Sequence, residues 1–88
     1  KVVITPMCVL AGLTTIQEGA NLGMGAQVHQ HTIIGAYSIV ATGASVLKNV
    51  IPFSRYIPGK PLSVNSYAIN KFNFSEFSDE IERYVMHN

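Results

Sequence analysis

An aliphatic residue occupies every sixth position over the first half of the sequence. The series runs from Ile4 to Val46 without interruption, and a small side chain lies two residues before each later member. A spacing of six fits neither the 3.6-residue period of an α-helix nor the two-residue alternation of an ordinary half-buried strand. The aliphatic positions are Ile4, Leu10, Ile16, Leu22, Val28, Ile34, Val40 and Val46, and the small ones are Cys8, Thr14, Ala20, Ala26, Thr32, Ser38 and Ala44.

This period predicts an all-β fold, a parallel β-helix in which three hexapeptides complete one triangular coil. We expect the aliphatic side chains to fill the interior, the small ones to lie inside near the corners, and Gly23 and Gly35 to supply positive φ at the bends. The stack contains fewer than three coils, so it is marginal alone, because each coil contacts only one or two neighbours. The alternative is a small β-sandwich, but turn signals every six residues are too closely spaced for it.

The repeat is expected to stop at Pro52. The segment PFSRYIPGKPL that begins there holds three prolines and one glycine, which predicts an extended exit segment. After it we expect a short α-helix with Ser75 as its N-cap, packed through Phe77 and Tyr84. The predicted organisation is therefore parallel β-helix coils over residues 1–51, a proline-rich exit loop and extended segment over 52–74, and a C-terminal helix over 75–88.

Composition limits the class of protein. The chain has 88 residues, of which 48% are hydrophobic and 12% charged, so it is expected to fold as one domain. No apolar run has the length of a membrane span and the first residues do not have the layout of a signal peptide, so no membrane span and a cytoplasmic location are expected. The lone Cys8 excludes an internal disulfide, and its apolar neighbours argue against a reactive thiol. Because Lys1 already lies inside the repeat, the coils are expected to be the end of a longer solenoid.

Charge is divided along the chain. Residues 1–75 hold five basic side chains and one acidic one, for a net charge of +4, whereas residues 76–88 hold four acidic and one basic, for −3. The basic part is a weak indication of an anionic ligand. The basic residues are scattered, without a cluster or a run of stacking aromatics, so nucleic acid is not an expected partner.

The sequence AGLTTIQEGANLGMGAQVHQHTIIGAYSIVATGASVLKNVIPF resembles the later coils of the UDP-N-acetylglucosamine O-acyltransferases of lipid A biosynthesis. The resemblance rests on Ala11-Gly12, on Val28-His29-Gln30 followed by Ile33-Ile34-Gly35-Ala36, and on Val64-Asn65, and it extends over residues 8–84. These enzymes are left-handed parallel β-helices that assemble as homotrimers, with active sites between subunits. The resemblance implies acyl transfer from an acyl carrier protein to a hydroxyl of a nucleotide sugar, without a further cofactor.

The resemblance also implies catalytic roles. The family's general base is a histidine that takes the proton of the sugar hydroxyl, and it would lie ahead of Lys1, so the isolated 88-residue chain is expected to be inactive. Gly12 corresponds to the glycine whose backbone N–H is the oxyanion donor. The next residue in the family is a histidine that binds the nucleotide sugar, whereas this chain has Leu13, which leaves the identity of the acceptor sugar open.

His29 and Gln30 correspond to a His-Gln pair that contacts the acceptor sugar in the cleft between subunits. Because His29 follows the inward residue Val28, its side chain is expected to point outward. The alternative is that His29, Gln30 and His31 are solvated polar positions. No zinc or other metal site is expected, because His29 and His31 have no third ligand at suitable spacing.

The remaining implied residues concern the acyl donor. Thr42 stands where the family limits acyl-chain length, and threonine in place of glycine implies a shorter chain. Lys71 and Phe72 replace a pair of arginines that binds carrier protein or diphosphate, and lysine keeps the charge but not the bidentate geometry. Lys48 and Lys60 are further candidates for contact with an acidic carrier protein, with solubility as the alternative role.

Two other functions stay open at this point. One is an acetyl-CoA-dependent sugar acetyltransferase of the same fold. The other is a non-catalytic, truncated trimeric β-helix, which the departures from the family at Leu13 and Phe72 favour.

Overall fold

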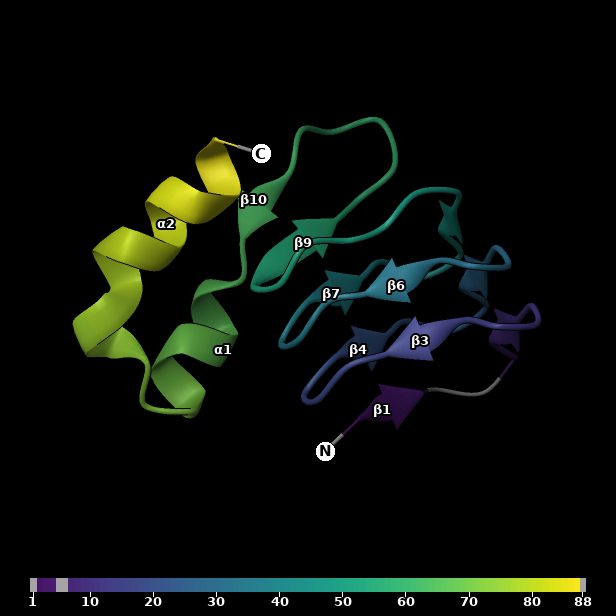
Figure 1. Cartoon of the computed structure of the whole chain (residues 1–88), viewed down its shortest axis with the longest axis horizontal. Helices are drawn as coiled ribbons and strands as arrows, with labels where there is room; N and C mark the ends of the chain where they lie inside the picture. Colours follow the sequence, from purple (N-terminus) through teal and green to yellow (C-terminus); the bar gives the residue numbers. More distant parts are fainter. Residues whose placement is uncertain (1, 5–6, 88) are drawn as a thin grey trace.

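The computed structural model describes residues 2–4 and 7–87, and its first part is a stack of two-residue strands that follow the period of the sequence (Figure 1). Each aliphatic residue of the repeat is the second residue of a strand. The strands are β1 (Val3–Ile4), β2 (Val9–Leu10), β3 (Thr15–Ile16), β4 (Asn21–Leu22), β5 (Gln27–Val28), β6 (Ile33–Ile34), β7 (Ile39–Val40) and β8 (Ser45–Val46).

Each of the strands β1 to β5 pairs in parallel with the strand three positions later. Val3 pairs with Asn21, 18 residues along the chain, and Leu22 pairs with Val40 at the same separation. The orders β1-β4-β7, β2-β5-β8 and β3-β6 define three faces of the stack. Three hexapeptides therefore make one coil, and the arrangement of strands in parallel sheets is compatible with a β-helix.

The interior of the stack consists of the positions that the repeat predicts. Packing of aliphatic side chains from successive coils stabilises it by about 2 kcal/mol for each fully buried side chain. In the first coil Ile4 and Leu10 remain 46% and 39% exposed, because only one neighbouring coil contacts them. The buried aliphatic residues are Leu22, Val28, Ile34, Val40 and Val46, and the buried small ones are Ala20, Ala26, Thr32, Ser38 and Ala44.

The bends differ from the prediction. Positive φ occurs three residues after each aliphatic position from Ile4 to Val40, so the expectation that Gly23 and Gly35 supply it is wrong. These two glycines are needed because the next coil is close: an added Cβ would lie 2.6 Å from the backbone N of Thr42 at Gly23, and 2.6 Å from the carbonyl oxygen of Val50 at Gly35. The residues with positive φ in these bends are Met7, Leu13, Gly19, Gly25, His31, Tyr37 and Gly43.

The coils do not end at Pro52. The chain loses two residues of the period after Val46, so that Val50 bridges to Ile34 and then β9 (Ser54–Tyr56) pairs in parallel with β7. Val40 lies opposite Tyr56, a separation of 16 residues. The expectation of an extended loop from residue 52 is therefore corrected: the shortened coil places β9 on the sheet that β1, β4 and β7 begin.

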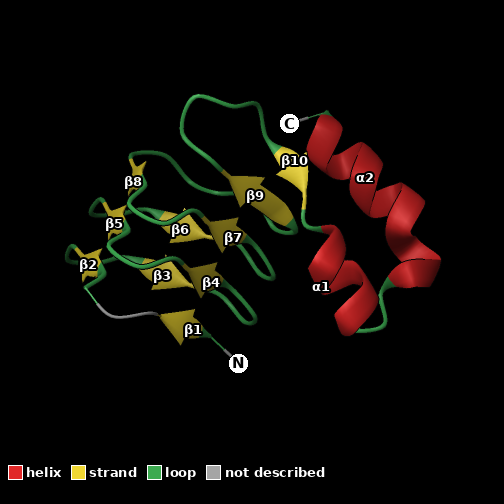
Figure 2. Cartoon of the chain, turned by 180° about the vertical axis from the view of Figure 1, so that it is seen from behind, coloured by secondary structure: helices red, strands yellow, loops and turns green. Residues whose placement is uncertain are grey.

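The rest of the chain forms a hairpin strand and two helices beside the coils (Figure 2). Strand β10 (Ser63–Val64) pairs antiparallel with β9, and it leads directly to α1 (Ser66–Lys71) inside the segment expected to be extended. A 3-10 turn, η1 (Ser75–Phe77), precedes the terminal helix α2 (Ser78–Met86). A short C-terminal helix is therefore confirmed, but Ser75 is not its N-cap; that position is taken by Phe77, which makes no side-chain capping hydrogen bond.

An aromatic cluster joins the helical segment to the coils. Tyr37, in a bend of the stack, stacks on Phe53 with ring centroids 5.4 Å apart and also contacts Phe72 and Phe74, each at 5.1 Å. In α2 the buried residue is Val85, whereas Phe77 and Tyr84 stay 46% exposed. The expectation that α2 packs through Phe77 and Tyr84 is corrected accordingly.

Candidate functional site

Three of the residues singled out in the sequence, Gly12, His29 and Gln30, lie at one corner of the stack, in the bends that follow β2 and β5. Gly12 and Gln30 each follow by two residues the paired positions Leu10 and Val28, so they occupy equivalent places on successive coils. Lys48 follows Val46, in the next bend, but that bend is two residues shorter, so the register of Gly12 and Gln30 does not extend to it. His29 precedes Gln30, and its N–H donates to the carbonyl of Val46 at 3.0 Å. The 18-residue coil thus places a backbone amide, at Gly12, on the same side of the stack as the imidazole of His29 and the side-chain amide of Gln30.

A shallow groove of about 370 Å³ runs along the outer face of β2, β5 and β8 next to this corner. It combines apolar walls with hydroxyl, amide and imidazole groups, which suits a polar ligand with an apolar portion. The lining residues are Val9, Ala11, Gln27, Val28, His29, Gln30, Ser45 and Leu47.

His29 and Gln30 are both exposed, as expected from the inward position of Val28. Within residues 2–4 and 7–87, neither side chain takes part in a hydrogen bond or an ion pair. The imidazole has two ring nitrogens and the amide has both donors and an acceptor, so the pair can bind the hydroxyl and amide groups of a sugar.

Gly12 lies in the exposed turn that follows β2, and a Cβ added there would meet no atom within 4 Å. Space is therefore open for a ligand to approach the backbone at this point. Leu13, the next residue, has a φ of 62° and is 77% exposed. It adds an apolar side chain to the rim where the resemblance implies a histidine.

Thr42 is not part of this corner. It lies in the exposed bend between β7 and β8, and its backbone packs against Gly23 of the preceding coil. A side chain at this position borders a different edge of the coil from the one that carries His29.

The two other lysines are also apart from the His29 corner. Lys71 ends α1, with its Nζ 5.3 Å from the ring centroid of Tyr67 and 5.6 Å from that of Phe72. Lys60 lies in the turn that joins β9 to β10, where its N–H donates to the carbonyl of Ile57 at 3.1 Å. Lys48, Lys60 and Lys71 therefore belong to three different elements and do not form one basic cluster.

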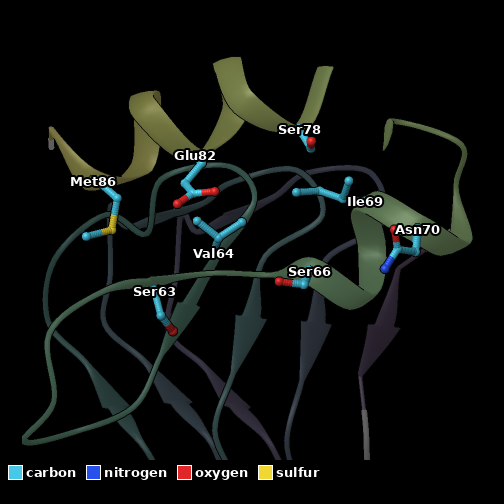
Figure 3. A pocket seen from close by; sticks show the side chains of 8 residues that line it. All are labelled: Ser63, Val64, Ser66, Ile69, Asn70, Ser78, Glu82 and Met86. Carbon is cyan, nitrogen blue, oxygen red and sulfur yellow. The ribbon is translucent and has the colours of Figure 1, made fainter. Parts of the chain in front are cut away.

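Sequence reasoning missed a hollow between β10, α1 and α2, with a volume of about 520 Å³ (Figure 3). Glu82 and Met86 reach into it from α2, opposite Val64, and hydroxyl groups border it on the other side. No sequence signal pointed to it, because it exists only where α1 and α2 meet. The lining residues are Ser63, Val64, Ser66, Ile69, Asn70, Ser78, Glu82 and Met86.

Among residues 2–4 and 7–87, no group of three or more His, Cys, Asp or Glu side chains is placed to hold a metal ion. No helix in the same part of the chain combines the length and the apolar character needed to cross a membrane.

Comparison with known proteins gave no match: neither a scan against protein-family models nor searches of curated proteins and of solved structures found a significant similarity to this chain.

Proposed function

We propose that this chain provides the acceptor-binding coils of a cytoplasmic, trimeric, left-handed parallel β-helix acyltransferase. The reaction is transfer of an acyl group from acyl carrier protein to a hydroxyl of a nucleotide sugar of the UDP-N-acetylglucosamine type, as in lipid A biosynthesis. The observation that supports it most is the corner at which Gly12 and Gln30 occupy equivalent bends of successive coils and His29 and Gln30 line an open groove.

Each group at this corner suits one part of the reaction. When the sugar oxygen attacks the thioester carbonyl, negative charge develops on the carbonyl oxygen, and a backbone N–H such as that of Gly12 stabilises it without moving. His29 and Gln30 hydrogen-bond the sugar and hold its hydroxyl in place. Lys48, in the bend that follows β8, supplies a positive charge for the diphosphate or for an acidic carrier protein. In this proposal the residues of the corner bind and orient the sugar, and they do not remove its proton.

The apolar surface around the groove supports an active site between subunits. Val9, Leu13 and Leu47 are 57%, 77% and 66% exposed on this side of the coil. Apolar side chains exposed in such numbers next to a groove are typical of a surface that another chain covers. A trimer that packs these faces together would turn the shallow groove into an enclosed cleft.

Acceptor binding tests the proposal directly. UDP-N-acetylglucosamine is titrated into the protein and its dissociation constant is measured by NMR chemical-shift changes or calorimetry. We expect His29→Asn to weaken binding by about tenfold, since a charged or well-oriented hydrogen bond contributes about 1.5 kcal/mol.

His31→Asn is the matched control. His31 lies two residues away, is also exposed, and has a φ of 61° that asparagine tolerates, but it does not line the groove. Equal effects of the two substitutions, or no binding of the nucleotide sugar by the unmodified protein, would count against the assignment of the acceptor site.

A further inference from the structure

A second groove, formed by aromatic side chains, lies on the opposite part of the molecule from the His29 corner. It has a volume of about 480 Å³ and lies between the bend that precedes β9 and the exposed face of η1 and α2. We refer to it as the aromatic groove. Its lining residues are Pro52, Phe53, Phe74, Phe77, Glu80, Ile81 and Tyr84.

Aromatic packing against Tyr37, in a bend of the coils, holds the walls of the aromatic groove in place. Phe53 and Phe74 meet edge to face, with centroids 5.3 Å apart and an angle of 81° between their planes. Tyr37 contacts both rings from behind, at 5.4 and 5.1 Å. Phe77 and Tyr84 close the other side, and each is 46% exposed. The groove is therefore a fixed aromatic surface that solvent reaches.

The charge of the aromatic groove selects the kind of ligand. Glu80 is the one carboxylate among its lining residues, and the lining includes no lysine, arginine or histidine. An anion would be repelled by Glu80, and a neutral hydrocarbon would gain nothing from it. A cation with an apolar shell gains from both, because the faces of aromatic rings attract positive charge and the carboxylate adds a Coulombic attraction.

The chain itself already contains one such contact. The ammonium group of Lys71 lies over the rings of Tyr67 and Phe72, at 5.3 and 5.6 Å from their centroids. Phe72 belongs to the same aromatic cluster through its contact with Tyr37. One side of the cluster therefore receives an ammonium ion from within the protein, while the aromatic groove on the other side is open to solvent.

We propose that the aromatic groove is a binding site for a small, soluble alkylated ammonium compound of about the size of choline. The aromatic rings contact the methyl groups of the cation, and Glu80 faces its charge. This site is independent of the proposed acyltransferase function, since it shares no residue with the His29 corner.

A pair of ligands of nearly equal shape tests the proposal. Choline and its uncharged isostere 3,3-dimethyl-1-butanol are titrated into the protein, and binding is followed by NMR of the aromatic side chains. We expect choline to bind at least about fivefold more tightly, with shifts at Phe77 and Tyr84, because one exposed cation–π contact contributes about that factor. Equal affinities, or tighter binding of the alcohol, would overturn the proposal and leave only a non-specific apolar surface.

Two substitutions locate the effect. Glu80→Gln removes the charge and is expected to weaken choline binding by about threefold to fivefold while leaving dimethylbutanol unchanged. Glu82→Gln is the control: it removes a charge from the same helix, but Glu82 lines the hollow of Figure 3 and not the aromatic groove. Far-UV circular dichroism verifies that both variants retain α2. A loss of the same size in both variants would show general attraction to an acidic helix and would overturn the assignment to the aromatic groove.

Discussion

At the scale of single residues, glycine has two separate functions in this chain. Gly43 adopts a φ of 72° in a bend where a Cβ would meet nothing within 4 Å, so only its backbone conformation requires glycine. Gly23 is the reverse case, because its φ is ordinary but a Cβ would lie 2.6 Å from the N and 2.8 Å from the Cα of Thr42. Backbone on a neighbouring coil does not move aside as the end of a side chain does.

These two functions predict different costs for the same substitution. Gly23→Ala is expected to destabilise the fold by about 2 kcal/mol or more, since it forces two coils apart. Gly43→Ala is expected to cost about 1 kcal/mol for its backbone conformation alone. Gly12→Ala, with open space and no positive φ, should stay within about 0.5 kcal/mol. Urea denaturation measures the free energy of unfolding of the three variants. A loss for Gly12→Ala equal to that for Gly23→Ala would contradict this account.

At the scale of elements, Asn65 is the link between the coils and the first helix. Its side-chain oxygen accepts from the N–H of Ala68 at 3.2 Å, which caps α1, while its Nδ2 donates to the carbonyl of Tyr37 at 2.7 Å. Asn65 is 3% exposed, so both bonds lie away from water. One buried amide therefore fixes where α1 starts and where it lies against the bend that contains Tyr37.

Removal of this amide is expected to loosen the helical segment. Asn65→Ala loses the cap and the bond to Tyr37 and should cost about 2 kcal/mol. Asn65→Asp keeps an acceptor for Ala68 but places a buried carboxylate oxygen against the carbonyl of Tyr37, so it is expected to cost at least as much. Thermal unfolding followed by circular dichroism provides the comparison, with exposed Asn70→Ala as a control expected to change little. If Asn65→Ala behaved like Asn70→Ala, the link would have no energetic role.

The repeat continues beyond Pro52, but with a shift of two residues. Ser54 repeats the contact of Ser38: each hydroxyl donates at 2.7 Å to the carbonyl three residues earlier, of Ile51 and Gly35 respectively. A shift of two residues in the period reveals this similarity. An uninterrupted spacing of six does not, because it places the next aliphatic position at Pro52 instead of at Val50.

At the scale of the whole molecule, stability is distributed unevenly along the stack. A coil in the middle is covered on both sides, whereas the coil of β1, β2 and β3 pairs with one neighbour. Leu10 and Leu22 hold equivalent positions in the repeat but are 39% and 0% exposed. In a structure with nearest-neighbour contacts, the first coil is expected to open more readily than the second.

This gradient predicts unequal effects of the same truncation. Leu22→Ala is expected to cost about 3 kcal/mol, and Leu10→Ala about 1 kcal/mol, because only the first leaves a cavity enclosed on all sides. Urea denaturation measures both, and amide hydrogen exchange should be faster in β1–β3 than in β4–β6. Equal costs, together with uniform exchange, would mean that the coils open as a single unit.

The core of the coils was predictable from the amino-acid pattern alone. The period of six predicted the buried aliphatic positions between Leu22 and Val46, and it predicted that His29 points outward. Both were predictable because the direction of a side chain in a strand depends on local alternation alone. The coarse order of coils followed by a terminal helix was also predictable, because α2 carries its own helical periodicity.

The remaining features depend on contacts between segments that are distant in the sequence. The alignment of Gly12 with Gln30 depends on the number of residues in a coil, which the local pattern suggests but contact between coils determines. The two-residue shift at Val50, the helix α1 and the aromatic groove arise from contacts between segments far apart in sequence, such as Tyr37 with Phe72 and Phe74. Short segments of this kind have weak preferences of their own, so the surface on which they pack selects their conformation.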